Sequence, residues 1–464
     1  MRYVSTRGGA PVIGFREAVL AGLAVDGGLY APEFWPQMSM EEMRGFSRRA
    51  FAEAAATVIS KFSGGELSEA DILPMSRQAF AQFDTDEVAP VASLGGDDFL
   101  LELFHGPTLA FKDIAMSMLA ELYGWALADS ARGKTIIGAT SGDTGGAAIH
   151  AFAGSAKAEV FMLHPKGRIS DVQRRIMTTV ASSNIVNVAV EGSFDDCQRI
   201  VKQLFADDAL RAALDLGGVN SINWVRVAVQ TVYYFTAAAR FSEPVSFVVP
   251  TGNFGDVFAG YAARRMGLPV KRLGVAVNRN DIMRRAIETG DYEPAATWPT
   301  TSPSMDIQIA SNFERVLFDV LDRDAKALSV LMDDLERRGR MSIPAGARKR
   351  IAEAFCAARA DESDVDQMMR EIHERLGMLI DPHTAVGLAA LAKMRASGEI
   401  TGPAVSLATA HPAKFPDAVS AATGARPELP ARYRDLFARP EYLVEAPASA
   451  DAVREILFER SRFI

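Results

Sequence analysis

The stretch Val245-Ser-Phe-Val-Val-Pro250-Thr-Gly-Asn-Phe-Gly-Asp256 decides the fold, because an apolar run leads through a glycine-containing turn into a helical pattern. The run predicts a buried strand. Free N–H groups and the helix dipole at such a helix start attract anions, and the glycines let the chain approach them closely. Since the turn lacks both a lysine and a dinucleotide fingerprint, we predict an isolated phosphate monoester as its ligand. A plain strand–helix connection is the alternative.

The same order of strand, turn and helix recurs along the chain. Alternation of this kind predicts an α/β fold with largely parallel sheets, in which ligands gather beyond the carboxyl ends of the strands. The other strand-like runs are Phe99–Leu103, Thr135–Gly138, Arg272–Val277 and Ala404–Ala408.

A second turn, Ala139-Thr-Ser-Gly-Asp-Thr-Gly-Gly146, gathers hydroxyl groups at another expected helix start. Such a turn suits a carboxylate or a second phosphate. Alternatively, Ser141 or Thr144 is an ordinary helix N-cap.

A third turn, Phe104-His-Gly-Pro-Thr-Leu-Ala-Phe-Lys-Asp113, precedes an apolar stripe at helical spacing, so Lys112 is expected in or near the first turn of a helix. The helix dipole and burial both oppose a cation at this position. They favour the neutral amine, which is the form that attacks an aldehyde. A solvated surface lysine whose stem packs on Phe111 is the alternative.

Composition narrows the class of protein. The 464 residues predict two or three domains, and 48% hydrophobic with 23% charged residues is typical of a globular chain. The net charge of -8, from 50 basic and 58 acidic residues, gives no reason to expect nucleic acid or an anionic membrane as a partner. Cys197 and Cys356 lack zinc-ligand spacing, so no metal site is expected. The small number of cysteines, together with the absence of a signal-peptide pattern at the start, favours a reducing, cytoplasmic location.

Several segments together resemble the longer form of the threonine synthase family. The segment His105–Asp113 is similar to the cofactor-lysine motif of that family. The other similar segments, in family order, are Tyr3–Gly8, Asp26–Tyr30, Gly138–Gly145, Asn220–Trp224, Gly252–Asp256, Ser302–Ile307 with Ser311–Arg315, and Thr409–Phe415.

The resemblance implies the fold type II, tryptophan-synthase-β-like architecture and pyridoxal 5'-phosphate (PLP) as cofactor. It implies that Lys112 is the catalytic Schiff-base lysine and that Thr409 meets the pyridine nitrogen. Asp143 lies in the expected region of the cofactor hydroxyl. The turn expected to hold the cofactor phosphate comprises Gly252, Asn253, Phe254, Gly255 and Asp256. Candidates for binding substrate are Ser5, Arg7, Thr140, Ser141, Thr144, Asn223, Arg226 and Lys414.

The family's reaction converts O-phospho-L-homoserine and water to L-threonine and phosphate, the last step of threonine biosynthesis. It proceeds by γ-elimination of phosphate and β-addition of water, so a carbon–oxygen lyase is expected. The chain is expected to act as a monomer or homodimer. The alternatives are a serine/threonine dehydratase of the same fold, which needs no second phosphate site, and a non-catalytic relative, which is expected to lack the lysine.

The expected organisation has three parts. Residues 1–95 form a mostly helical N-terminal region, with helices at Arg16–Leu23 and Ser39–Phe62. Residues 121–234 form a small α/β domain. Residues 96–120 and 235–464 form a larger PLP-binding α/β domain with a helix-rich insertion at about 320–395.

Overall fold

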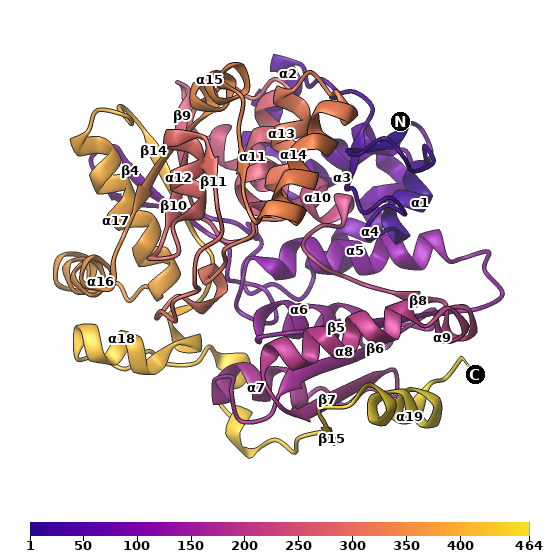
Figure 1. The fold of residues 1–464 in the computed structure, drawn as a ribbon. Helices are drawn as coiled ribbons and strands as arrows, with labels where there is room; N and C mark the ends of the chain where they lie inside the picture. The colour runs from indigo at the N-terminus through magenta and orange to yellow at the C-terminus, as the bar shows by residue number, and fades with distance from the viewer. Residues whose placement is uncertain (464) are drawn as a thin grey trace.

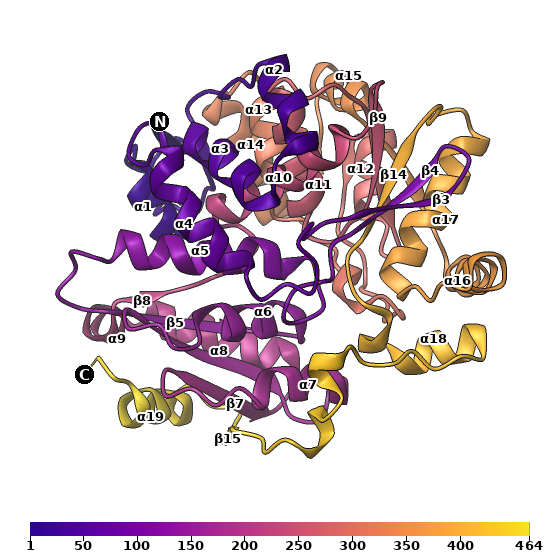
Figure 2. The same ribbon diagram turned by 180° about the vertical axis from the view of Figure 1, so that it is seen from behind.

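The computed structural model describes residues 1–463, which fold into two α/β lobes and a helical N-terminal region (Figures 1 and 2). The larger sheet lies in the upper lobe of Figure 1, and the smaller sheet lies below it. In this part of the chain, no helix is both long and apolar enough to cross a membrane.

The larger sheet has the strand order β13-β10-β9-β14-β4-β3, in which β3 is antiparallel to β4 and the other neighbours are parallel. Strand β9 is buried along its length, which explains the uninterrupted apolar run that predicted it. The strands are β3 (Val91–Gly95), β4 (Asp98–Glu102), β9 (Val245–Pro250), β10 (Val270–Val277), β13 (Phe355–Arg359) and β14 (Ala404–Ala408).

Helices cover this sheet and extend the lobe. Helix α17 packs against four of its strands, and α16 packs on α17 (Figure 1). The helices of this lobe are α10 (Trp224–Ala238), α11 (Gly255–Arg265), α12 (Ile282–Thr289), α13 (Phe313–Val320), α14 (Ala325–Arg338), α15 (Ala345–Ala354), α16 (Glu362–Leu376), α17 (Pro382–Ala396) and α18 (Pro416–Thr423). Its short elements are β11 (Asp291–Tyr292), β12 (Met341–Ser342) and the 3₁₀ turns η2 (Pro303–Met305) and η3 (Pro412–Lys414).

The smaller sheet is wholly parallel, with the order β15-β7-β6-β5-β8. Its strands are β5 (Lys134–Ala139), β6 (Ala158–Pro165), β7 (Ile185–Glu191), β8 (Leu216–Gly217) and β15 (Val444–Pro447). Its helices are α6 (Asp143–Phe152), α7 (Asp171–Thr178), α8 (Phe194–Ala206), α9 (Asp208–Leu214) and α19 (Ala450–Arg460).

The end of the chain differs from the expected division. Residues up to 464 were assigned to the larger unit, but β15 pairs with β7 and α19 packs on α8, so both lie on the smaller lobe. Figures 1 and 2 show this yellow segment descending from α18 through the turns η4 (Ala431–Tyr433) and η5 (Leu436–Ala438). The strand pairing therefore corrects that boundary.

The N-terminal region packs on α10 and on α5 (Lys112–Ala126). Trp224 at the start of α10 joins them, because the rings of Tyr3 and Phe62 lie 6.0 and 5.5 Å from it. The predicted helix Ser39–Phe62 is interrupted, since Ala50 is extended. The elements are β1 (Tyr3–Ser5), α1 (Phe15–Leu20), β2 (Tyr30–Pro32), α2 (Met40–Gly45), η1 (Phe46–Arg48), α3 (Phe51–Ser63) and α4 (Glu69–Phe80).

Candidate active site

Lys112 is the first residue of α5, as its sequence context predicted. The loop before it is joined to the segment after β14 by main-chain bonds. The N–H of Phe111 donates to the carbonyl of Thr409 at 2.9 Å, and the N–H of His411 donates to that of Leu109 at 3.0 Å. Leu109 has a φ of 60°, a left-handed conformation that is uncommon for a leucine. These contacts place Lys112 and Thr409 beside one another.

The ammonium group of Lys112 lies 3.2 Å from Asp143 Oδ2 and 4.8 Å from the centre of the Phe111 ring. The lysine side chain is 13% exposed. Burial lowers its pKa; Asp143 opposes the shift, and the positive charges of Lys414 and Arg226 add to it. The surroundings therefore favour the neutral amine, as expected for a lysine that bonds an aldehyde.

Asp143, at the start of α6, lies at the centre of a cluster of polar side chains. Besides Lys112, it contacts the ammonium of Lys414 at 2.6 Å, the amide of Gln173 at 3.0 Å and the hydroxyl of Ser304 at 3.2 Å. Although burial acts to raise its pKa, the two ammonium groups hold the pKa of Asp143 well below its usual range. The carboxylate therefore stays ionised and draws both lysines to one point.

The turn between β9 and α11 is built to hold an anion. Among residues 1–463, the N–H groups of Gly252 to Asp256 donate to no protein acceptor, and they lie at the start of an 11-residue helix. Phe254 takes a left-handed φ of 64° at the helix N-cap. A Cβ on Gly252 would lie 2.6 Å from the carbonyl oxygen of Ser304, so a side chain cannot enter this turn. These features fit the phosphate group of PLP.

The side chain of Asp256 points away from this anion site. Its carboxylate accepts hydrogen bonds from Tyr233 at 2.5 Å and Tyr234 at 2.9 Å on α10. Burial raises the pKa of Asp256 to about 6, against the opposing effect of the two tyrosine hydroxyls. Its expected part in phosphate binding is thus left to its N–H group.

Four hydroxyl groups in the predicted site differ in their hydrogen bonds and exposure. Thr140 accepts from the N–H groups of Gly142 and Gly145 at 3.0 and 2.9 Å, so its oxygen holds the turn together. Thr144 is half-buried and Thr409 is buried; within the described chain neither hydroxyl has a hydrogen-bond partner, which leaves both able to meet a ligand. Ser141 is exposed, and the cap residue of α6 is Gly142 rather than Ser141 or Thr144.

Arg226 is a buried cation that lacks a counter-ion in the described chain. It is 4% exposed, and its Nε and Nη1 atoms have no hydrogen-bond partner there. Burial lowers its pKa to about 10, a value that still leaves the guanidinium charged at neutral pH. Because its charge also lowers the pKa of Lys112, it lies close enough to act on the same site. An anionic ligand would satisfy it.

Three predicted substrate residues are engaged elsewhere. Ser5 donates to Asp26 at 2.8 Å, and Arg7 pairs with Glu314 at 3.2 Å. Asn223 caps α10, accepts from Val225 and donates to two backbone carbonyls at 2.9 Å. None of these contacts connects with the Lys112 cluster, and a part for the three residues in substrate binding stays a prediction.

Ser304, Gln173 and His383 were missed as site residues. Ser304 lies in Ser302–Ile307, one of the segments that resemble the family, and this resemblance is the one sequence feature that could have indicated it. His383 accepts a hydrogen bond from the N–H of Ser304 at 3.3 Å across 79 residues of chain.

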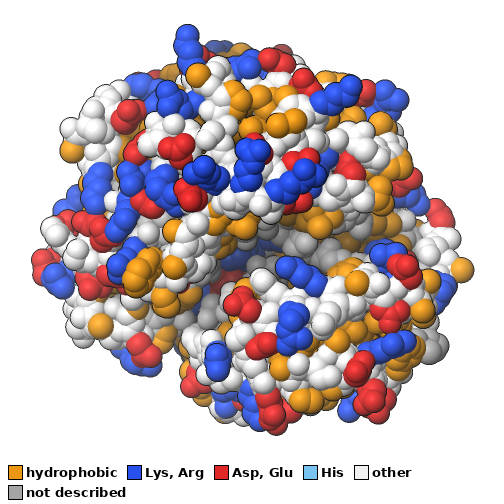
Figure 3. Space-filling model, viewed as in Figure 1, with side chains coloured by type: hydrophobic (Ala, Val, Ile, Leu, Met, Phe, Trp, Pro, Cys, Tyr) orange, Lys and Arg blue, Asp and Glu red, His pale blue; other side chains and the backbone are white. Residues whose placement is uncertain are grey.

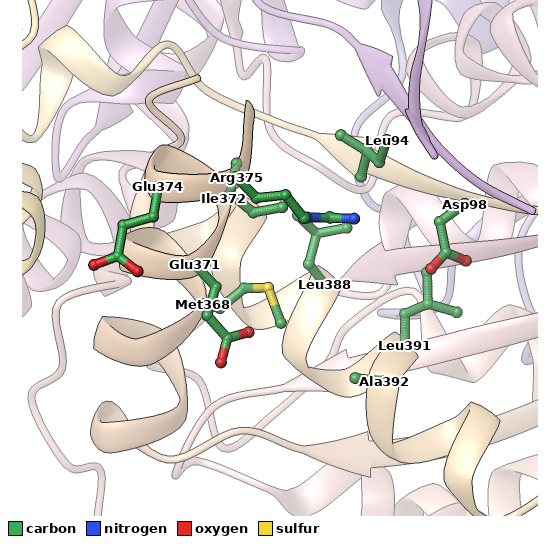
Figure 4. A pocket seen from close by; sticks show the side chains of 10 residues that line it. All are labelled: Leu94, Asp98, Met368, Glu371, Ile372, Glu374, Arg375, Leu388, Leu391 and Ala392. Carbon is green, nitrogen blue, oxygen red and sulfur yellow. The ribbon is translucent and has the colours of Figure 1, made fainter. Parts of the chain in front are cut away.

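The molecular surface is hollowed between the two lobes, with apolar and basic side chains at the rim and in the depth (Figure 3). A separate pocket of about 460 Å³ lies between α16, α17 and the β3–β4 pair (Figure 4). Leu94, Ile372 and Leu388 line it together with charged residues such as Glu371 and Arg375. It contains no lysine and no free helix start, so it does not suit an aldehyde cofactor.

Comparison with known proteins gives matches over nearly the whole chain. Three family models match successive parts: threonine synthase N terminus (residues 2–80), pyridoxal-phosphate dependent enzyme (90–336) and threonine synthase, C-terminal (384–457). A threonine synthase from Pseudomonas aeruginosa is 45% identical over 451 residues, which is 96% of each chain.

Two solved structures have the same fold. PLP-bound threonine synthase from Brucella melitensis is 48% identical, covers 100% of both chains and gives a TM-score of 0.96. Threonine synthase from yeast is 35% identical, with a TM-score of 0.94 over 99% of this chain and 98% of its own. These likenesses confirm the predicted fold type II, α/β architecture.

Proposed function

The chain belongs to the threonine synthase family of pyridoxal-phosphate dependent enzymes, and on that basis we propose that it converts O-phospho-L-homoserine and water to L-threonine and phosphate. Family membership confirms the expected cofactor. The finer assignment, a carbon–oxygen lyase acting on a phosphate ester, is our proposal.

One observation carries this proposal: groups suited to two separate anions lie around one buried lysine. Free N–H groups at the start of α11 suit the cofactor phosphate. Arg226, buried without a counter-ion in the described chain, suits the phosphate ester of the substrate. A dehydratase acting on serine or threonine needs no second phosphate site, and no observation favours that alternative.

Several residues are proposed to hold PLP. Lys112 would supply the amine that binds its aldehyde, and Thr409 would hold the ring through its pyridine nitrogen. The N–H groups from Gly252 to Asp256 would bind the phosphate, and Asp143 would serve the ring hydroxyl. When bound, PLP supplies an electron sink that stabilises negative charge at the α-carbon of the substrate.

The protein's part in the reaction is to bind anions and to move protons. Lys112, whose pKa is lowered by burial, takes the proton from the α-carbon of the substrate and can return it later. Arg226, Ser141 and Thr144 bind the anionic groups of the substrate. Lys414, held by Asp143 and by the carbonyl of Thr108 at 2.9 Å, keeps a second positive charge beside Lys112. This charge lowers the pKa of Lys112 and attracts the substrate phosphate.

The test compares two products from two substrates. We expect the purified protein to release inorganic phosphate from O-phospho-L-homoserine and little ammonia from L-threonine. Ammonia from threonine without phosphate release would identify a dehydratase and refute the proposal. Lys112→Ala should lose both phosphate release and the visible absorption band that borohydride bleaches. A reducible band that persists in this variant would refute the role of Lys112.

Three further assignments concern the location, the domains and the assembly of the protein. Cys197 and Cys356 are buried free thiols, which supports a cytoplasmic location. We keep the division into an N-terminal region and two α/β domains, with β15 and α19 moved to the smaller one. A monomer or homodimer remains our proposal for the assembly.

A further inference from the structure

His383 has no proposed part in binding cofactor or substrate, yet it contacts Ser304, whose hydroxyl donates to Asp143. It is the second residue of α17, is 3% exposed, and its ring lies 4.9 Å from that of Phe415, next to Lys414. Asp381 caps the same helix. It accepts from the N–H groups of His383 and Thr384 at 3.0 and 3.1 Å, and from the hydroxyl of Thr384.

The partners of the His383 ring decide where its proton lies. Nδ1 is 2.7 Å from Asp381 Oδ2, and a carboxylate oxygen already receiving an N–H can only accept, so Nδ1 carries the proton. Nε2 receives the N–H of Ser304 at 3.3 Å, so it must be the acceptor. The ring is therefore neutral and is oriented from both sides.

Ser304 uses three groups to connect His383 with the site. Its N–H donates to His383, its hydroxyl donates to Asp143 at 3.2 Å, and its carbonyl oxygen lies against Gly252 of the phosphate turn. Ser304 belongs to the turn η2, whose C-terminal end is fixed separately. There Asp306 accepts from Asn278 at 2.8 Å and from Asn280 at 3.0 Å. His383 thus holds the end of this turn that touches the site.

We propose that His383 is a positioning residue. With its ring oriented by Asp381, it holds Ser304 so that the turn η2 supports both Asp143 and the phosphate-binding turn at Gly252–Asp256. The inference rests on the proposed cofactor site and adds a residue that touches neither cofactor nor substrate. Its loss should weaken PLP binding, because the turn would no longer press on Gly252 and the hydroxyl of Ser304 would leave Asp143.

Two variants separate the two sides of the ring. The amide of His383→Asn can replace Nδ1 and still bond Asp381, but it does not reach Ser304. The longer His383→Gln can present an oxygen to the N–H of Ser304. Thr384→Val is the matched control, because it removes a buried hydrogen bond to Oδ1 of Asp381 and leaves Oδ2, the oxygen that contacts the His383 ring, in place. Each full-length protein is freed of cofactor and titrated with PLP, following the visible band, and its thermal midpoint is measured.

We expect His383→Asn to weaken PLP binding about tenfold, which is the effect of losing one buried hydrogen bond and leaving its donor unpaired. His383→Gln should recover most of that loss, whereas Thr384→Val should lower the thermal midpoint and bind PLP as the wild type does. The proposal is overturned if His383→Asn binds PLP normally, if the glutamine gives no recovery, or if the valine weakens binding equally. Failure of the proposed site would differ, because the wild-type protein itself would then show no reducible band.

Discussion

The substitution Asp143→Asn keeps the size and shape of the aspartate side chain but removes its negative charge, which lies between the buried amino groups of Lys112 and Lys414. Lys414 lies 2.6 Å from the carboxylate and Lys112 lies 3.2 Å from it, and all three side chains are at least 87% buried. Removing one partner of a buried ion pair costs about 3–5 kcal/mol, because the remaining charge is left uncompensated. Since the pKa of Lys112 is already lowered, this lysine can release its proton, so we expect the lower end, about 3 kcal/mol.

The pH dependence of this loss has a definite sign. The pKa of Asp143 is held well below its usual range in the folded protein, so the native state binds the proton less readily than the unfolded chain. Its stabilising effect is complete above the unfolded pKa of about 3.9 and disappears as the pH falls further. The difference between wild type and Asp143→Asn should therefore be largest at neutral pH and shrink in acid.

The assay is urea unfolding of the cofactor-free proteins, followed by circular dichroism between pH 7 and pH 3. Asp417→Asn is the control, because the Asp417–Arg426 pair lies 3.5 Å apart on the exposed surface and should contribute little. A loss below about 1 kcal/mol at pH 7, similar to that of an exposed pair, would refute the description of Asp143 as the centre of the cluster. So would a difference that stays constant as the pH falls.

Three other variants test the site. Gly252→Ala places a Cβ 2.6 Å from the Ser304 carbonyl, so PLP should bind at least tenfold more weakly, as measured by titration of the cofactor-free protein; normal affinity would contradict the tight turn. Arg226→Met removes a buried cation without a counter-ion in the described chain. It should raise KM for the phosphate ester while leaving the urea midpoint unchanged or higher, and a large loss of stability would point to a structural role. In the folded wild type the pKa of Asp256 is raised to about 6, so the folded protein binds this proton more tightly than the unfolded chain does. The resulting stabilisation is lost as the pH rises from about 4 to about 6, and urea unfolding of Asp256→Asn should lack this pH dependence.

Local signals in the sequence predicted the parts of the fold that depend on neighbouring residues. Strand β14 has the predicted bounds, and α5 begins at Lys112, because an apolar run and a helical stripe are properties of short segments. The interruption at Ala50 was not predicted, since the helical pattern continues through it. The pairing of β15 with β7 joins segments more than 250 residues apart and leaves no local trace.

The sequence could predict the candidate lysine and the candidate anion-binding turn, because each is a property of one short segment. Arg7 and Asn223 carry suitable groups, but their partners, Glu314 and the carbonyls of Val19 and Ala21, come from distant segments that no spacing reveals. His383 was overlooked for the same reason, because its link to Ser304 exists only after folding. Family resemblance supplied what local physics could not, namely which lysine among many is the candidate Schiff-base residue.

The antiparallel bridge that joins residues 109–111 to 409–411 fixes the distance between the backbone segments of Lys112 and Thr409, the two residues proposed to hold the cofactor ring. The two main-chain hydrogen bonds that form the Ala110–Ala410 bridge set the separation of the two segments, so rotation of side chains cannot widen it. Substitutions in the surrounding strands and helices can therefore leave the distance between these two backbone segments unchanged. Redesign for a larger or smaller ring would have to change the path of the backbone itself, which no single substitution in the site can do.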